Sequence, residues 1–292
     1  MKKALILSVV LLSLLLQSCM HTNPFKDVPD VTAVSQETTT AKPSDDPPLP
    51  QYSYLSPLAQ EYEAFLYLTQ TTSPKYLYII NKTYNQFGVI NAVYQPENLV
   101  TIDSTAATRG GIQLDERVAK ALYAMLSEMA LEGIADVRVT SGYRDYTYQK
   151  ALFEGYYHDE QKGISDEAKA YFGEDYIQKN YIDKEIFLLS SEDAEKVANY
   201  YSAKPGESEH HTGLSVDLFS ITDNDYLSED TAAYRWLEQN AHRFGFILRY
   251  RKDKSDITGY MFEPWHFRYV GRDAASIMYE QNLTLEEYLG VL

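Results

Sequence analysis

The sequence contains a single cysteine, Cys19, among its 292 residues. A chain with one thiol cannot form an intramolecular disulfide, nor a site in which several thiolates hold a metal. Basic residues are also few, because 26 lysines and arginines face 42 acidic residues and leave a formal net charge of −16. So acidic a protein binds polyanions poorly, which argues against nucleic acid as a partner, and anionic lipid would repel it.

Only one long apolar run is present, and it lies at the N-terminus. Two lysines precede residues 4–16, a run that is too short for a comfortable membrane span and is typical of a secretory signal. The Ser18–Cys19 pair that follows resembles the end of a bacterial lipobox. We therefore predict that residues 1–18 are a lipoprotein signal peptide and that Cys19 carries the lipid. The alternative is an ordinary secretory signal with an incidental cysteine.

These N-terminal features predict an exported protein, anchored by lipid at the extracellular face of the bacterial cytoplasmic membrane. Residues 1–18 contain two lysines and no acidic residue, so their removal would change the charge from −16 to −18. Residues 19–55 are rich in Thr, Ser, Pro and Asp, with few large apolar side chains. Such a segment buries too little apolar surface to offset its ordering entropy, so we predict a flexible linker.

Residues 56–292 are expected to form one folded domain. Apolar spacing predicts five helices, at residues 57–70, 113–133, 146–170, 193–201 and 232–244. Short apolar runs predict five strands, at residues 76–80, 137–140, 214–219, 246–249 and 265–270. Residues 155–192 are rich in charge and tyrosine without an apolar stripe, which indicates a surface insertion. Mixed helices and strands without regular βαβ repetition favour an α+β fold around an antiparallel sheet, flanked by helices.

Two polar segments carry candidate metal ligands. His210 lies in a polar loop, Asp217 lies on the apolar strand that follows, and His266 lies near the C-terminus. Two imidazoles and one carboxylate would leave a fourth position open, with Glu263 as a spare carboxylate, which is what a hydrolytic zinc centre requires. His211 is a competing ligand candidate. An arginine partner or a solvent-facing position for Asp217 is the alternative.

The spacing of Glu263 and His266 matters for their roles. On a straight strand, residues three apart point to different sides of the sheet. A bend at Pro264 would let His266 reach a metal while Glu263 reaches the attacking water, and a general base must contact the nucleophile without taking its place. The alternative is a surface glutamate beside a packed aromatic strand.

Arg144 stands at a predicted junction between a strand and a helix. A guanidinium there could face a cleft, with Ser141 and Gln149 nearby. Arginine binds carboxylates through two parallel hydrogen bonds and stabilises oxyanions, so Arg144 is a candidate for either task. In so acidic a chain, a surface salt bridge is the alternative.

Taken together, these segments resemble the VanY-type D-alanyl-D-alanine carboxypeptidases, which share a fold with the LdcB-type L,D-carboxypeptidases. Three ordered motifs carry the resemblance: Ser-Gly-Tyr-Arg at 141–144 followed by Gln149, Lys-Pro-Gly-Glu-Ser-Glu-His at 204–210 running to Asp217, and Glu-Pro-Trp-His-Phe-Arg-Tyr-Val-Gly at 263–271. The similarity covers roughly residues 76–285. It implies a Hedgehog/DD-peptidase-like domain that acts on peptidoglycan stem peptides.

The resemblance also implies roles for individual residues. Three would hold one zinc ion per chain: His210, Asp217 and His266. Glu263 would be the general base, and Arg144 would stabilise the oxyanion or hold the substrate. Three more would contact the peptide: Ser141, Gln149 and Ser208.

The chain departs from the family pattern in three places. The insertion at 155–192 is longer than usual, His211 stands where glutamine is common, and Arg251 stands where proline is common. None of these removes a ligand or the base, so removal of the C-terminal D-Ala from pentapeptide stems is the leading expectation. L,D-carboxypeptidase action on tetrapeptide stems and a non-catalytic, wall-binding lipoprotein are the alternatives. No sequence pattern indicates an oligomeric state.

Overall fold

The computed structural model describes residues 51–68 and 73–291. The predicted signal peptide, Cys19 and the linker up to residue 50 lie outside the described residues. Residues 51–55, the end of the predicted linker, contact the folded domain. Tyr54 is buried, and its hydroxyl donates to the backbone oxygen of Arg243 at 2.8 Å. Packing on the domain therefore begins before residue 56.

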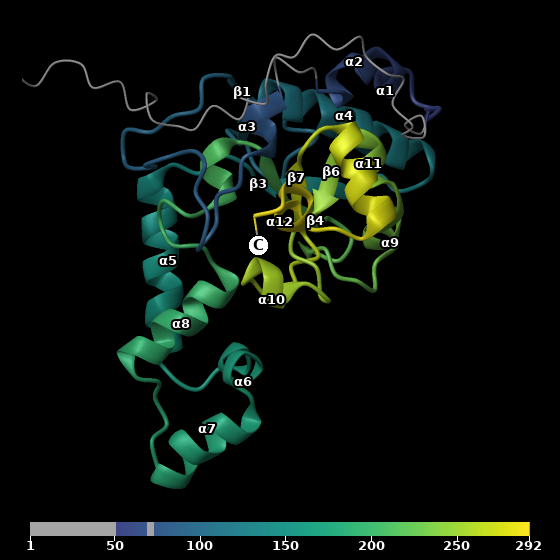
Figure 1. Ribbon diagram of the computed structural model, residues 1–292. Helices are drawn as coiled ribbons and strands as arrows, with labels where there is room; N and C mark the ends of the chain where they lie inside the picture. Colours follow the sequence, from purple (N-terminus) through teal and green to yellow (C-terminus); the bar gives the residue numbers. More distant parts are fainter. Residues whose placement is uncertain (1–50, 69–72, 292) are drawn as a thin grey trace, which may run out of the picture. The chain divides into compact units, whose positions relative to one another are not determined.

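The central sheet is built from short strands that lie far apart in the sequence (Figure 1). Its order is β3-β4-β7-β6, with β5 paired to β4, and every pair is antiparallel. The bounds are β3 Val137–Ser141, β4 Ser215–Ser220, β5 Asp225–Tyr226, β6 Phe246–Leu248 and β7 His266–Tyr269. A separate antiparallel pair consists of β1 Leu99–Thr101 and β2 Gln113–Asp115. The predicted α+β fold around an antiparallel sheet is confirmed.

Strand register brings the candidate ligands together. Asp217 on β4 lies opposite Ser141 on β3 and opposite His266 on β7. The pairing of β3 with β4 becomes irregular between Val139 and Ser141, which is typical of a bulge that redirects a strand beside a site. The end of β3, the middle of β4 and the start of β7 therefore meet at one level of the sheet.

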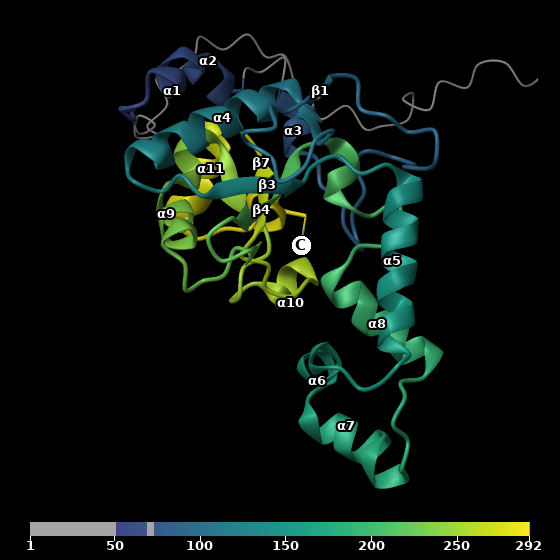
Figure 2. The same ribbon diagram turned by 180° about the vertical axis from the view of Figure 1, so that it is seen from behind.

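Helices cover the sheet and extend beyond it (Figures 1 and 2). Their bounds are α1 Pro57–Glu61, α2 Glu63–Leu66, α3 Ser73–Leu77, α4 Glu116–Leu131, α5 Tyr146–Glu160, α6 Asp166–Phe172, α7 Glu174–Asn180, α8 Ser191–Tyr201, α9 Ala232–Asn240, α10 Ser255–Thr258, α11 Arg272–Gln281 and α12 Leu285–Leu289. Short 3₁₀ helices are η1 Ile182–Lys184, η2 Glu209–Thr212 and η3 Ala241–Phe244. Within the described ranges, no helix is both long and apolar enough to cross a bilayer.

The helix predicted at residues 113–133 forms, but its first residues do not belong to it. Residues 113–115 pair with β1 as strand β2, and α4 then runs from Glu116 to Leu131. Asp115 is the N-cap residue of α4. Its side chain accepts a hydrogen bond from the backbone N–H of Arg117, an interaction that favours the start of a helix. From there Val118, Leu122 and Met125 are buried on one face of α4.

The strand predicted at residues 76–80 was wrong. Tyr76 and Leu77 end helix α3, and Ile80 makes only an isolated bridge to Asn85. The side chains of Ile79 and Ile80 are both fully buried, whereas a half-buried strand would alternate. A short apolar run does not distinguish a buried strand from a buried helical segment, because either can be buried on all sides.

Three other predicted helices are interrupted. The one at 57–70 breaks at Tyr62 into α1 and α2, and residues 69–70 lie outside the described part. The one at 146–170 ends at Glu160, and α6 starts only at Asp166. The one at 232–244 becomes the 3₁₀ helix η3 after Asn240.

The insertion at residues 155–192 has a small hydrophobic core, which its sequence did not indicate. Helices α5 and α8 run side by side away from the sheet, and α6 and α7 lie at their far end (Figures 1 and 2). The buried residues that the insertion contributes to this core are Ala168, Ile177, Tyr181 and Leu189, and they pack against Ala194 and Val197 of α8. They come from two short helices and the loops around them, so no single stretch of the insertion shows an apolar stripe.

Candidate metal centre

Three of the predicted ligands lie together. Ligand atoms of His210, Asp217 and His266 are all within 4.8 Å of one another, and all three side chains are buried. They come from η2, β4 and β7, so the group depends on the pairing of β4 with β7. Two imidazoles and one carboxylate on rigid elements match the ligand set of a catalytic zinc site.

His210 is oriented by the backbone of the strand-to-helix loop. Its Nδ1 lies 2.7 Å from the backbone oxygen of Gly142, which can only accept, so Nδ1 carries the proton. The other nitrogen, Nε2, lies 3.2 Å from Oδ2 of Asp217. Burial, together with the charge of Arg144, lowers the pKa of His210 to about 4. The ring is therefore neutral at pH 7, with Nε2 free to coordinate a metal.

Replacing Gly142 with alanine is expected to disturb this support. The added Cβ would lie 2.5 Å from the backbone oxygen of Gln113 and 2.9 Å from Leu114 Cδ2, so the loop must shift. We expect a loss of about 1–3 kcal/mol in unfolding free energy, the usual cost of overpacking, and weaker metal binding. Urea unfolding and metal titration measure the two effects. Gly155→Ala, on α5 with open space around it, is the control, and equal behaviour of both variants would contradict the account.

Asp217 is ionised despite its burial. Burial alone would favour the neutral acid, but the Arg144 guanidinium opposes it, and the pKa of Asp217 lies well below its usual range. Nη2 of Arg144 forms a salt bridge with Oδ2 of Asp217. A charged carboxylate is the form that binds a metal.

One ring nitrogen of His266 lies close to the candidate ligand Asp217. Its Nδ1 lies 2.9 Å from Oδ1 of Asp217 and 4.0 Å from Oε2 of Glu263. Its ring stacks on Tyr250, with centroids 4.9 Å apart. The donor atoms that fit a metal are therefore His210 Nε2, a carboxylate oxygen of Asp217 and His266 Nδ1.

The chain bends between Glu263 and His266, as the proline suggested. The backbone N–H of His266 donates to the oxygen of Glu263 at 3.1 Å, and β7 begins only at His266. This turn leaves the Glu263 carboxylate beside the three ligands without making it one of them. Burial raises the pKa of Glu263 to about 8, and a cation bound to the neighbouring ligands would lower it again. A carboxyl group tuned in this way suits proton transfer near neutral pH.

Arg144 is held in place by two of the residues predicted to contact substrate. Its Nε donates to Ser141 Oγ at 2.8 Å, and its Nη1 donates to Gln149 Oε1 at 3.2 Å. Both partners are buried, so in this structure they orient the guanidinium. Ser208 lines the pocket beside the ligands and caps η2 by accepting from the backbone of His210.

His211, the competing candidate, is engaged elsewhere. Its Nδ1 lies 2.8 Å from the backbone oxygen of Arg144, and its Nε2 accepts from the backbone of Gly206 at 3.0 Å. Both ring nitrogens therefore have partners, and the ring stacks on Tyr146. His211 supports the loop that carries Arg144 and does not belong to the ligand group.

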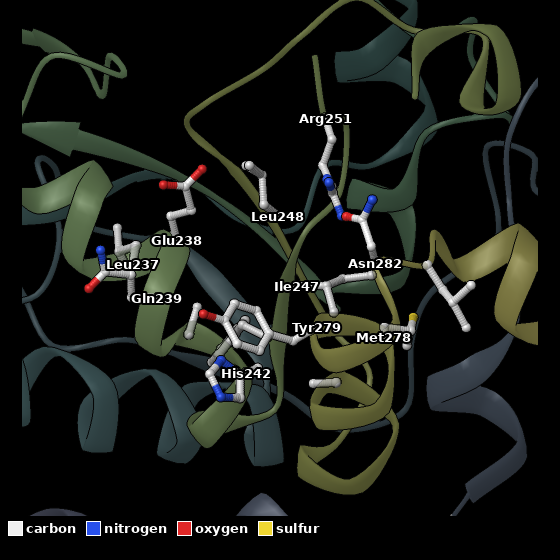
Figure 3. Close-up of a pocket in the computed structure, with 14 residues that line it drawn as sticks. Leu237, Glu238, Gln239, His242, Ile247, Leu248, Arg251, Met278, Tyr279 and Asn282 are labelled. Atoms are coloured by element: carbon white, nitrogen blue, oxygen red, sulfur yellow. The ribbon is translucent and has the colours of Figure 1, made fainter. Parts of the chain in front are cut away.

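The three candidate ligands line a pocket of about 250 Å³. Arg144, Glu263 and Trp265 line it, and the insertion adds Tyr156 and Glu167. The insertion, longer than is usual in the family, therefore reaches this pocket. A larger cavity, of about 320 Å³, lies between α9, η3, β6 and α11 (Figure 3). There His242 stacks on Tyr279, and the three clustered candidate ligands do not line it, so the smaller pocket is the candidate site.

Comparison with known families agrees with this geometry. Residues 111–272 match the model of the family described as VanY, D-alanyl-D-alanine carboxypeptidase. The chain belongs to the VanY family. The matched residues include Arg144, His210, Asp217, Glu263 and His266.

Individual relatives show the extent of the similarity. A D-alanyl-D-alanine carboxypeptidase of Enterococcus faecalis is 39% identical over 179 residues, 61% of this chain and 56% of that protein. The protein YodJ of Bacillus subtilis is 34% identical over 218 residues, 73% of this chain and 66% of that protein. The chain thus spans less than two thirds of the length of both VanY-like relatives.

Solved structures share the fold. A mutant of the vancomycin resistance D,D-pentapeptidase VanY in complex with Zn(II) is 32% identical, with a TM-score of 0.55 over 74% of this chain and 99% of that one. VanYB in complex with D-alanine-D-alanine is 32% identical, with a TM-score of 0.56 over 74% of this chain and 98% of that one. The LdcB LD-carboxypeptidase is 33% identical, with a TM-score of 0.54 over 73% of this chain and 84% of that one. The resemblance predicted from the three motifs is confirmed.

Proposed function

We propose that this protein is a zinc-dependent carboxypeptidase that removes the C-terminal D-Ala from peptidoglycan stem peptides. The observation that carries the proposal is the buried group of His210, Asp217 and His266 with Glu263 beside it. A solved VanY with Zn(II) supports the metal, and a solved VanYB with D-alanine-D-alanine supports the substrate. One zinc ion per chain would be held by the three ligands.

When bound there, zinc would act as a Lewis acid that makes water a nucleophile near neutral pH and polarises the scissile carbonyl. Glu263 takes the proton from the attacking water and returns it to the departing amine. Its position outside the ligand group lets it do so without blocking the metal. Arg144, oriented by Ser141 and Gln149, opposes the negative charge that grows on the carbonyl oxygen or holds the substrate's terminal carboxylate.

L,D-carboxypeptidase activity on tetrapeptide stems is the second candidate. The LdcB LD-carboxypeptidase is as similar to this chain as the VanY structures are, in both identity and TM-score. Both reactions use the same metal and base. Their difference lies in the pocket for the residue before the cleaved bond, and the insertion contributes Tyr156 and Glu167 to the lining of the cleft.

Stem peptides separate these candidates. Purified protein, with and without a chelator, is incubated with a pentapeptide and a tetrapeptide stem, and the products are weighed by mass spectrometry. We expect the pentapeptide to lose one alanine only without chelator, while the tetrapeptide stays intact. Cleavage of the tetrapeptide alone would establish the second candidate. Cleavage of neither would leave a wall-binding lipoprotein.

We also propose that the protein is located at the cell surface. Residues 1–18 would be removed, Cys19 would carry a lipid at the extracellular face of the cytoplasmic membrane, and residues up to about 50 would serve as a linker. The charged start, the apolar run and the Ser18–Cys19 pair support this arrangement. About thirty extended residues reach up to roughly 100 Å, which suits an enzyme that acts on the wall. Metabolic labelling with a fatty acid, lost in Cys19→Ser, would test the anchor.

A further inference from the structure

Glu209 is a buried carboxylate directly before the ligand His210, with a side chain only 1% exposed. Its Oε1 accepts hydrogen bonds from Arg249 Nε and Arg268 Nη1, both at 2.9 Å. Its Oε2 has no hydrogen-bond partner within the described residues, and neither has Nε2 of His266. These two atoms lie 3.5 Å apart.

Buried polar atoms without a partner cost free energy, so two complementary ones only 3.5 Å apart indicate an interaction. The Nδ1 of His266 is on the metal side, 2.9 Å from Asp217 Oδ1. If Nδ1 coordinates the metal, the ring's single proton must sit on Nε2, where Glu209 Oε2 is the nearby acceptor. We infer that Glu209 is a positioning residue, which accepts the Nε2–H of His266 and so fixes the tautomer and orientation of this ligand. The inference rests on the proposed zinc site.

Glu209 is itself held by a buried network of opposite charges. Arg249 and Arg268 are both fully buried, and Arg249 also pairs with Glu286 on α12. Two buried arginines therefore neutralise two buried glutamates. Such pairing is needed because an unpaired charge in the protein interior is strongly destabilising. Arg268 also donates to the backbone oxygens of Tyr76, in α3, and of Tyr78, just after this helix. The orientation of one metal ligand thus depends on elements from both ends of the domain.

A metal-bound histidine is commonly oriented by such a carboxylate, whose loss typically weakens metal binding 10- to 100-fold. Glu209→Gln tests this here. Glutamine offers one acceptor oxygen in place of two, so it cannot serve the arginines and His266 together. We expect the zinc affinity of the folded variant, measured by competition with a chromogenic chelator, to fall 10- to 100-fold.

Glu128→Gln is a matched control. Glu128 is equally buried, but its carboxylate accepts from the backbone N–H groups of Leu55 and Ser56. This variant should lose stability and keep the zinc affinity of the wild type. Wild-type zinc affinity in folded Glu209→Gln would overturn the inference, because Glu209 would then serve folding alone.

A second measurement stands if Glu209→Gln does not fold. In ¹⁵N spectra of the zinc-loaded wild type, we expect a slowly exchanging proton on Nε2 of His266 and one on Nδ1 of His210. A proton on Nδ1 of His266 would overturn the inference. Neither readout involves a substrate, so the inference can fail while stem peptides are still cleaved. A wild type that binds no zinc would refute the proposed function as well.

Discussion

Glu263→Gln is expected to lower turnover of a pentapeptide stem at least about 100-fold while zinc stays bound, because general acid–base catalysis typically contributes a factor of that size or more. Glutamine keeps the shape of the side chain but cannot take a proton from water and return it to the amine. The carboxylate lies 4.0 Å from His266 Nδ1 and outside the three-residue ligand group, so its loss should leave the metal in place. Steady-state kinetics and the zinc content of the variant measure the two effects.

Glu207→Gln is the control for this variant. Glu207 lies in the loop before Ser208 but does not line the pocket at the ligands. The turnover of Glu207→Gln should therefore match that of the wild type. Turnover of Glu263→Gln within a few-fold of the wild type would exclude Glu263 as the base. Loss of zinc from Glu263→Gln would show that the carboxylate serves as a ligand.

Metal removal should have an effect of similar or larger size. A metal that acts as a Lewis acid supplies several kcal/mol of transition-state stabilisation, and each 1.4 kcal/mol is a factor of ten in rate. Dialysis against a chelator should therefore lower turnover by at least about 100-fold, and zinc should restore it. Zinc at about 1,000 times its Kd should also raise the free energy of unfolding by about 4 kcal/mol, because the unfolded chain lacks the assembled site.

Two variants check that these effects arise at the proposed ligands. His266→Ala should show neither restoration of turnover nor stabilisation by zinc. His242→Phe changes a buried histidine of the other cavity and keeps an aromatic ring against Tyr279, so its response to zinc should match the wild type. Full restoration of His266→Ala by zinc would contradict the ligand assignment.

The ligand group was predictable because its residue types are rare and clustered. The chain has six histidines, and three of them stand in the two segments that carry Asp217 and Glu263: His210, His211 and His266. Their meeting depends on the pairing of β4 with β7, which places Asp217 opposite His266 although 49 residues separate them. Periodicity indicated both strands, but only the family motifs suggested that they come together.

Other features could not be predicted for physical reasons. Glu209 looks like a surface charge in sequence, because its partners Arg249 and Arg268 lie 40 and 59 positions away. Buried ion pairs leave no local pattern, unlike an apolar stripe. The core of the insertion was missed for a similar reason, since residues such as Ala168 and Ile177 lie on separate short helices. That the insertion brings Glu167 to the pocket of the candidate metal centre depends on this packing.

Measuring D-Ala release from a stem pentapeptide, while zinc is titrated into metal-free protein, tests the proposed zinc-dependent cleavage most directly. Release should rise in proportion to the added zinc and level off at one ion per chain, because the three ligands form a single site. Release that does not depend on zinc, or no release at one equivalent of bound zinc, would contradict the account.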